Sequence, residues 1–125
     1  MSYSYCVQDY RRLRVWQQSK ALTVEVYAIT SRFPPHERFG LAAQMRRAAV
    51  SLTSNIAEGC GRDTPRELSR FTSIAAGSAH ELESQMYNAL ALGMVDEDSA
   101  SRTIDAVGEI KAMLFAYRAS VDRNG

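Results

Sequence analysis

The stretch RFGLAAQMRRAAVSLTSNIAEGCGR, from Arg38 to Arg62, decides the fold that we expect for this chain. On a helix of about 3.6 residues per turn its apolar residues recur on one narrow face, as in the helices of a bundle core. The opposite side is not uniformly polar, because Val50 and Ala57 lie there among polar residues. A helix with small or apolar residues on two faces usually has two neighbours, one in its own bundle and one beyond it. The stretch therefore predicts a central bundle helix and assembly with further chains. Its core face comprises Leu41, Met45, Ala48, Leu52 and Ile56.

The composition indicates one domain with a hydrophobic core. The chain has 125 residues, of which 46% are hydrophobic, and this length allows a single core. No apolar run approaches the roughly 20 residues that a membrane span needs, and the N-terminus lacks the apolar segment of a secretory signal. Two cysteines, Cys6 and Cys60, do not make a disulfide framework. We therefore expect free thiols in a reducing cytoplasm.

The apolar periodicity divides the chain into a short tail and four helices. Residues 1–9 are expected to form a flexible tail, and residues 10–125 a bundle. Short connections make consecutive helices antiparallel. The predicted fold class is therefore all-α, a single antiparallel up-down-up-down four-helix bundle. The predicted helices cover about residues 10–32, 38–58, 65–92 and 97–121.

Prolines and polar caps set the predicted helix ends. Pro34 and Pro35 end the first helix, because proline lacks the backbone donor and clashes with the preceding turn. Thr64, Pro65 and Glu67 form a T-x-x-E capping box with proline at the first helical position, which predicts the start of the third helix. Asp96 or Asp98 is expected to cap the fourth helix.

Four glycines carry specific expectations. Gly59 and Gly61 are expected to close the second helix by taking left-handed backbone angles. Gly77 lies in mid-helix, where glycine costs about 1 kcal/mol relative to alanine. We therefore expect a tight helix crossing at Gly77. Gly93 is expected to end the third helix.

The sequence does not favour a metal centre or an active site. Neither His36 nor His80 lies three residues after a glutamate, as di-iron bundles require. Cys6 and Cys60 lack a C-x-x-C partner for zinc. Arg62 could lower the pKa of the Cys60 thiol, but no histidine is predictably adjacent, and GCGRD lacks the G-K-[ST] ending of a phosphate loop. We therefore expect no metal, no cofactor, no catalytic residue and no enzymatic activity.

Charge is distributed unevenly along the chain, although the net charge is only +1. Residues 1–70 contain 11 Lys or Arg and 6 Asp or Glu, a net of +5, and residues 71–125 contain 4 and 8, a net of −4. A dipolar protomer suits head-to-tail contacts, which close into rings when the rotation permits. It also leaves a basic region for an anionic partner. The alternative is a solvated surface with uneven charge.

Clusters of arginine are the candidate contacts for nucleic acid, because phosphate binding needs such clusters. No recognition-helix motif, zinc finger or aromatic RNA platform accompanies them. Sequence-independent binding of RNA or DNA is therefore the most that they predict, and an exposed face of mixed charge is the alternative. The candidates are Arg11, Arg12, Arg14, Arg46, Arg47, Arg62, Arg66 and Arg70.

Polar and aromatic residues beside the core are candidates for a structural or interface role. A half-buried charge must be paired or it destabilises the fold, so we expect Arg46 or Arg47 to pair with Glu58 or Glu81, inside the bundle or at a subunit interface. Trp16 is either a core residue or an anchor between subunits. The full set is Trp16, Tyr27, Arg47, Val50, Ser51, Asn55, Ala57, Glu58 and Glu81.

Five pieces of the sequence stand out by their order and spacing. They are RRLRVWQQS (Arg11–Ser19), FP-x-x-ERFGL (Phe33–Leu41), QMRRAAVS (Gln44–Ser51), SNIAEG (Ser54–Gly59) and GSAHELE (Gly77–Glu83). Together they resemble the four-helix-bundle family first noted as reading frames inside intervening sequences of bacterial large-subunit ribosomal RNA genes. The resemblance covers most of the chain, roughly residues 10–117.

The accessory variability proteins of diversity-generating retroelements look like relatives of this family. They assemble as five-fold rings of bundles and are associated with a reverse transcriptase and nucleic acid. The resemblance thus implies a homo-oligomer, in particular a pentamer, with RNA or DNA as a further partner. It implies no established activity, since presence in an RNA gene's insertion is genomic context and not mechanism.

The residues and the resemblance together predict a non-enzymatic, oligomeric four-helix-bundle protein that binds RNA or DNA weakly through arginines. The alternative is a scaffold or adaptor for protein partners with no nucleic-acid role.

Overall fold

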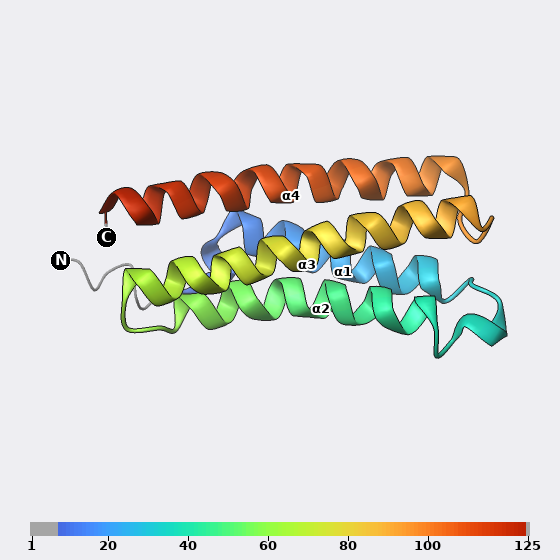
Figure 1. Cartoon of the computed structure of the whole chain (residues 1–125), viewed down its shortest axis with the longest axis horizontal. Helices are drawn as coiled ribbons and strands as arrows, with labels where there is room; N and C mark the ends of the chain where they lie inside the picture. Colours follow the sequence, from blue (N-terminus) through green and yellow to red (C-terminus); the bar gives the residue numbers. More distant parts are fainter. Residues whose placement is uncertain (1–7, 125) are drawn as a thin grey trace.

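A computed structural model describes residues 8–124 (Figure 1). No β-strand occurs among these residues, and the predicted all-α fold class is confirmed for them. The four α-helices are α1 (Arg14–Thr30), α2 (Leu41–Cys60), α3 (Pro65–Ala91) and α4 (Glu97–Asn124), and two short 3-10 helices are η2 (Tyr10–Arg12) and η3 (Pro35–Glu37).

The four helices lie side by side and form a bundle around one core. Helix α2 contacts α1 and α3, and α4 contacts α3 and α1. The connection between α2 and α3 lies at the left of Figure 1, together with the C-terminal end of α4. The connections from α1 to α2 and from α3 to α4 lie at the right.

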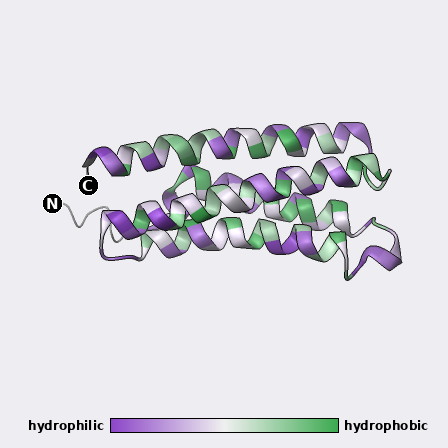
Figure 2. Cartoon of the chain, viewed as in Figure 1, coloured by the Kyte–Doolittle hydropathy of each residue, from purple (hydrophilic) through white to green (hydrophobic). Residues whose placement is uncertain are grey.

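Each helix buries one stripe of apolar side chains, and the coloured ribbons of Figure 2 show these stripes alternating with polar residues. The predicted core face of α2 is confirmed for Met45, Ala48, Leu52 and Ile56, whereas Leu41 is only partly buried. Small residues also belong to this core, among them Ala48 and Ala49 on α2 and Ala75 and Ala79 on α3. The largest fully buried side chains include Val26, Met45, Leu52, Leu68, Leu82, Met86, Val107, Ile110 and Leu114.

Local capping signals place several helix ends where the sequence predicts them. The Thr64 hydroxyl accepts a hydrogen bond from the Glu67 backbone N–H at 3.1 Å, at the start of α3. The Asp96 carboxylate accepts from the Ser99 N–H at 2.9 Å, before α4, and this hydrogen bond lowers the pKa of Asp96. Gly93 has a φ of 71° and follows the end of α3, as expected.

Other boundaries differ from the prediction for local reasons. The segment 10–12 forms η2, capped by Asp9, so α1 begins at Arg14 and not near residue 10. Helix α2 begins at Leu41 and not near residue 38, because the backbone of Gly40 is not helical. The structure extends α2 to Cys60 and α4 to residue 124.

The predicted tail, residues 1–9, lies mostly outside the described residues. Of its last two residues, Gln8 contacts the bundle and Asp9 caps η2. The Gln8 N–H donates to the Cys60 carbonyl at 3.1 Å, and the Asp9 side chain accepts from the Arg11 N–H at 3.1 Å. The part of the tail that the structure describes is therefore docked.

The expectations for three glycines are wrong. Gly59 lies inside α2, buried against α3, and Gly61 has a φ of −94°, so neither takes a left-handed angle. A Cβ at Gly59 would lie 3.0 Å from the Cβ of Phe71 and 3.1 Å from Cδ1 of Leu68. At Gly77, by contrast, a Cβ would have no neighbouring atom within 4 Å among the described residues. The close helix approach is therefore at Gly59 and not at Gly77.

Replacing Gly77 by alanine is expected to raise the free energy of unfolding by about 1 kcal/mol, because alanine is the better helix former and the added methyl group meets nothing. Urea denaturation followed by circular dichroism measures this change. Gly59→Ala is the matched control and should destabilise the protein, because its methyl group would crowd Phe71. A destabilised Gly77→Ala variant would contradict the prediction and would indicate a partner packed against this surface.

Candidate nucleic-acid interface

One residue, Gln8, lies between the two predicted arginine segments and contacts the bundle through its backbone and its side chain. Gln8 contacts both the end of α2, through the Cys60 carbonyl, and α4, through the Tyr117 hydroxyl, which donates to its Oε1 at 2.6 Å. Gln8 directly precedes η2, and Cys60 directly precedes the α2–α3 connection. We call this region the arginine-rich end; its arginines are Arg11, Arg12, Arg14, Arg62, Arg66, Arg70, Arg118 and Arg123.

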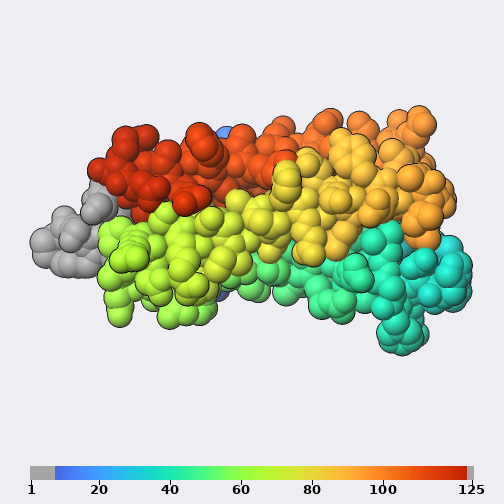
Figure 3. All heavy atoms as spheres, in the orientation of Figure 1, coloured from blue at the N-terminus to red at the C-terminus, as the bar shows by residue number. Residues whose placement is uncertain are grey.

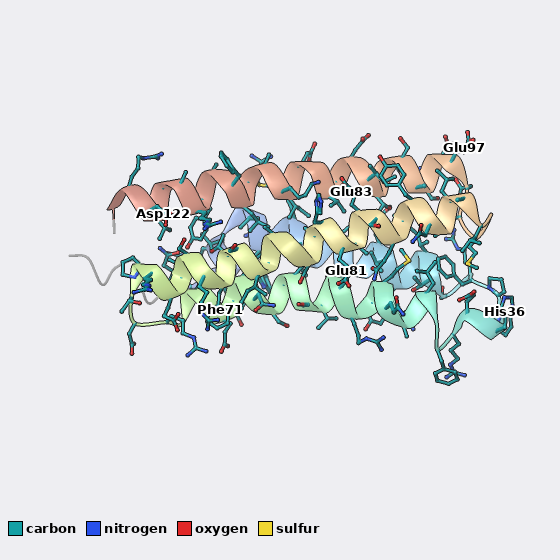
Figure 4. The ribbon with its side chains drawn as sticks, viewed as in Figure 1. His36, Phe71, Glu81, Glu83, Glu97 and Asp122 are labelled. Carbon is teal, nitrogen blue, oxygen red and sulfur yellow. The ribbon has the colours of Figure 1, made fainter. Side chains whose placement is uncertain are left out.

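Phe71, at the lower left of Figure 4, lies between two of the predicted arginines. The guanidinium carbons of Arg62 and Arg70 are each 4.7 Å from the centre of its ring. Arg62 also donates to Glu58 at 2.6 Å, and Arg70 donates to Glu67 at 2.9 Å. Stacking and ion pairing hold both guanidinium groups in place and partly neutralise them.

The remaining predicted arginines at this end differ in their partners. Arg11 donates from Nε and Nη2 to Asp9, at 2.9 and 3.1 Å, and these hydrogen bonds lower the pKa of Asp9. Arg12, Arg14 and Arg66 are exposed, and none of the described residues forms an ion pair with them. These three side chains are therefore the most available for phosphate groups.

Two predicted arginines lie elsewhere. Arg46 is in the second turn of α2, where its guanidinium lies 4.6 Å from the ring centre of Tyr27 and its Nε donates to Thr30 at 2.8 Å. Arg47 lines a hollow between α2 and α3. The structure thus does not place Arg46 and Arg47 at the arginine-rich end.

The expected pairing of Arg46 or Arg47 with Glu58 or Glu81 is wrong within the described protomer. Glu58 instead pairs with Arg62, four residues along the same chain. Arg46 packs against α1. Arg47 and Glu81 line the same hollow but form no ion pair within residues 8–124. Their pairing across a subunit interface stays a prediction.

The hollow between α2 and α3 has a volume of about 450 Å³ and a mostly polar lining. Glu81, labelled beside α3 in Figure 4, is one of its lining residues. Gln85 is 7% exposed, and its Oε1 has no hydrogen-bond partner among the described residues. Beside the hollow, the hydroxyls of Ser51 and Ser78 are 2.8 Å apart, and Asn55 donates to the Ser51 carbonyl at 2.8 Å. Ser51 thus links α2 to α3, and Asn55 contacts Ser51 from one turn along the same helix.

The outer face of α1 and α2 collects the apolar interface candidates. Trp16 and Ala57 line a hollow of about 300 Å³ together with Val24, which is 66% exposed. Tyr27 and Val50, each 42% exposed, continue this face on the two helices. Trp16 is only partly buried, so it is neither a full core residue nor a fully exposed one. Val24 is not among the interface candidates that the sequence predicts.

The structure also reveals a basic residue that the sequence reasoning missed. Arg118, on α4, donates from Nε to Ser69 and from Nη1 to Ser73, at 3.3 Å each, and so reaches across to α3. No neighbouring arginine marks it in the sequence. In the view of Figure 3, α3 runs along the middle of the visible face, with α4 on one side and α2 on the other.

Cys60 does not have the activated thiol that its neighbour Arg62 suggested. The side chain is 1% exposed, and burial raises the pKa of its thiol. Its sulfur lies 4.0 Å from the Tyr117 hydroxyl, whose pKa burial also raises. Cys6 lies outside the described residues. Within residues 8–124 no three His, Cys, Asp or Glu side chains are placed to hold a metal ion, and none of the helices is long and apolar enough to span a membrane.

Alkaline pH is expected to destabilise the protein through this buried pair. Folding keeps Cys60 and Tyr117 neutral, while in the unfolded chain they ionise near their ordinary pKa values of 9.0 and 10.0. Their stabilising contribution is therefore present below about pH 9 and is lost as the pH rises above it. Urea denaturation from pH 8 to 10.5 measures the loss, which should be smaller in a Cys60→Ala, Tyr117→Phe double variant. Identical pH profiles for the two proteins would contradict this assignment.

The fold and the site together define a class: a four-helix, all-α protein with arginines from both halves of the chain at one end. The chain belongs to the 23S rRNA-intervening sequence protein family, whose model matches residues 11–116. The resemblance seen in the sequence is thereby confirmed, whereas the kinship with accessory variability proteins stays a prediction. A comparison with curated proteins found no match.

Proposed function

We propose that this protein is a non-enzymatic, homo-oligomeric member of its family that binds RNA or DNA weakly and without sequence preference at the arginine-rich end. One observation supports this most directly. The segments 11–14 and 62–70 are about 50 residues apart in the sequence, yet Gln8 holds the first beside the start of the second.

The charge of this end suits a polyanion. Residues 8–14, 58–70 and 118–123 contain eight arginines and five Asp or Glu, a net of +3, although the whole chain has only +1. Arginine suits phosphate because its planar guanidinium offers several donors at once. Contacts to phosphate carry no sequence information, so binding of this kind does not discriminate between bases.

The proposal includes assembly of an antiparallel, up-down-up-down bundle into a ring. The positions of the three connections, at alternate ends in Figure 1, support that topology.

The exposed Val24, Tyr27 and Val50 on the outer face of α1 and α2 support a contact with another copy. The two halves of the chain carry charges of +5 and −4, which suits head-to-tail contacts. Five subunits is the number that the family resemblance implies, and a ring would repeat a weak site several times.

The test is a binding titration of the purified protein against structured RNA and duplex DNA across a series of salt concentrations. Phosphate contacts predict a linear fall of log affinity with log salt, with a slope of about −0.9 per contact on duplex DNA. Native mass measurement on the same sample reports the oligomeric state. A folded oligomer that binds neither nucleic acid at low salt would refute the proposal.

The second candidate function is a scaffold for protein partners, which the exposed apolar face of α1 and α2 favours. The salt titration distinguishes the two functions, because a scaffold has no reason to bind nucleic acid. A monomeric protein with this face free would favour the scaffold further.

A further inference from the structure

A groove of about 580 Å³ lies between the first turns of α3 and the last turns of α4, at the arginine-rich end. Arg66, Ser69, Arg70 and Ser73 line it from α3, and Arg118 and Asp122 line it from α4. Asp122 is labelled at the left of Figure 4, beside this groove. The groove thus brings together residues about 50 positions apart in the sequence.

Two serine hydroxyls hold the Arg118 guanidinium across the groove. Its Nε donates to Ser69 and its Nη1 to Ser73, at 3.3 Å each. The nearest carboxylate oxygen, Oδ2 of Asp122, is 3.9 Å from Nε, too far for a hydrogen bond. The side chain remains half exposed. Because its hydrogen bonds are to neutral groups and its only acidic neighbour among the described residues is an exposed carboxylate at 3.9 Å, the guanidinium is only weakly neutralised, and being positioned it loses less conformational freedom when it binds an anion.

The hydroxyl hydrogens of Ser69 and Ser73 are not used in their bonds to Arg118. Each hydroxyl has one donor and two acceptor lone pairs, and the bond from Arg118 uses only an acceptor site on each. The O–H groups of Ser69 and Ser73 can therefore turn toward an oxyanion in the groove. A phosphate oxygen is a strong acceptor for both the guanidinium and the hydroxyls.

The charge of the lining is positive after its acidic residues are counted. Three arginines and two acidic residues, Glu67 and Asp122, line the groove. Arg70 is engaged by Glu67 at 2.9 Å, whereas Asp122 lies 3.9 Å from Arg118 and pairs with it only weakly, so Arg66 on one wall and Arg118 on the other remain available to an anion. The N-terminus of α3 lies at the same place and adds the positive end of its dipole.

We infer that this groove binds one backbone phosphate of RNA or DNA, with Arg118 as the main contact, Arg66 as the second and Ser69 and Ser73 as hydroxyl donors. The inference rests on the proposed function and assigns to it a defined phosphate site. A single phosphodiester carries one negative charge on two oxygens, which matches the planar fork of one guanidinium.

The experiment measures binding of a labelled single-stranded RNA 20-mer by fluorescence anisotropy from 50 to 300 mM salt. Arg118→Gln should weaken binding about five-fold at 0.1 M salt, and it should reduce the log–log slope by about 0.7, the value for one phosphate contact on a single strand. The Ser69→Ala, Ser73→Ala double variant should also weaken binding, because it removes the hydroxyl groups that position Arg118. Arg102→Gln is the matched control: it lies on the same helix, also donates to a serine, and should leave affinity and slope unchanged.

The outcomes separate this inference from the proposed function. If the wild-type protein binds with a steep slope and Arg118→Gln binds with the same affinity and slope, the phosphate site is refuted and the proposed function still stands. Equal losses in Arg118→Gln and Arg102→Gln would also overturn it, because they would show only the effect of total charge. Absence of wild-type binding would overturn both. If a polyglutamate peptide displaced the RNA at equal charge concentration, the groove would be a site for acidic peptides and the inference would be wrong.

Discussion

Reversing Arg62, Arg66 and Arg70 to glutamate is expected to lower the affinity for RNA or DNA about 100-fold at 0.1 M salt. Each phosphate contact on a single strand contributes a factor of roughly five at this salt concentration. Reversal removes the contact of Arg66, and it replaces the partly neutralised Arg62 and Arg70 by negative charges that repel phosphate. The structure supports treating the three residues as one surface, because two of them stack on the same Phe71 ring and the third lines the adjoining groove. The salt titration described above is the measurement.

A control with the same change of net charge makes this result specific. Arg32, Arg38 and Arg102 lie toward the opposite end of the bundle, at the α1–α2 connection and the start of α4. Their reversal to glutamate changes the net charge by the same amount and should change affinity much less. If the two triple variants lost equal affinity, the arginine-rich end would have no special role.

A second variant guards against loss of folding. Arg62 and Arg70 pair with Glu58 and Glu67, so reversal places like charges together. Substituting the same three arginines by glutamine removes the positive charge without this repulsion. The glutamine variant should still lose most of the affinity while circular dichroism shows the helical content of the wild type.

Replacing Leu82 by alanine is expected to lower the free energy of unfolding by about 3 kcal/mol. Leu82 is 0% exposed in the middle of α3 and belongs to the single core that all four helices share. Truncation removes buried methyl groups and leaves a cavity that a tightly packed bundle closes only in part. Urea denaturation gives the free energy, with the slope of the transition checked for two-state behaviour.

Leu92→Ala is the matched control, because it makes the same chemical change at a residue that is 63% exposed, just after α3. Its effect should stay within about 0.5 kcal/mol. Similar losses for both variants would show that Leu82 is not the core residue that the structure indicates.

Much of the fold could be predicted because its signals are local. The cap at Thr64, the turn at Gly93 and the acidic cap at Asp96 each depend on residues within about four positions, and the structure has all three. The apolar stripe of α2 likewise follows from helical periodicity alone. The hydrophobic pattern of one helix says which face is buried, but not which residue of another helix it meets.

The candidate site could be predicted only in part, for that same reason. The arginines of segments 11–14 and 62–70 are visible in the sequence, but their proximity is not, since it is seen only in the contacts of Gln8 with Cys60 on α2 and Tyr117 on α4. The partners of Glu58 and Arg46 were assigned wrongly, because a side chain pairs with whatever the rotation of its helix brings near.

The amino-acid sequence by itself determined the helical class, the core face of α2, the caps of α3 and α4 and membership of the family. Only the tertiary structure decided that the close approach of two helices is at Gly59 and not at Gly77, and that Arg118 reaches Ser69 across the groove. Helix formation is governed by hydrogen bonds and side-chain spacing within a few residues. Contacts between helices depend instead on axial register and rotation, which the packing of the whole core sets.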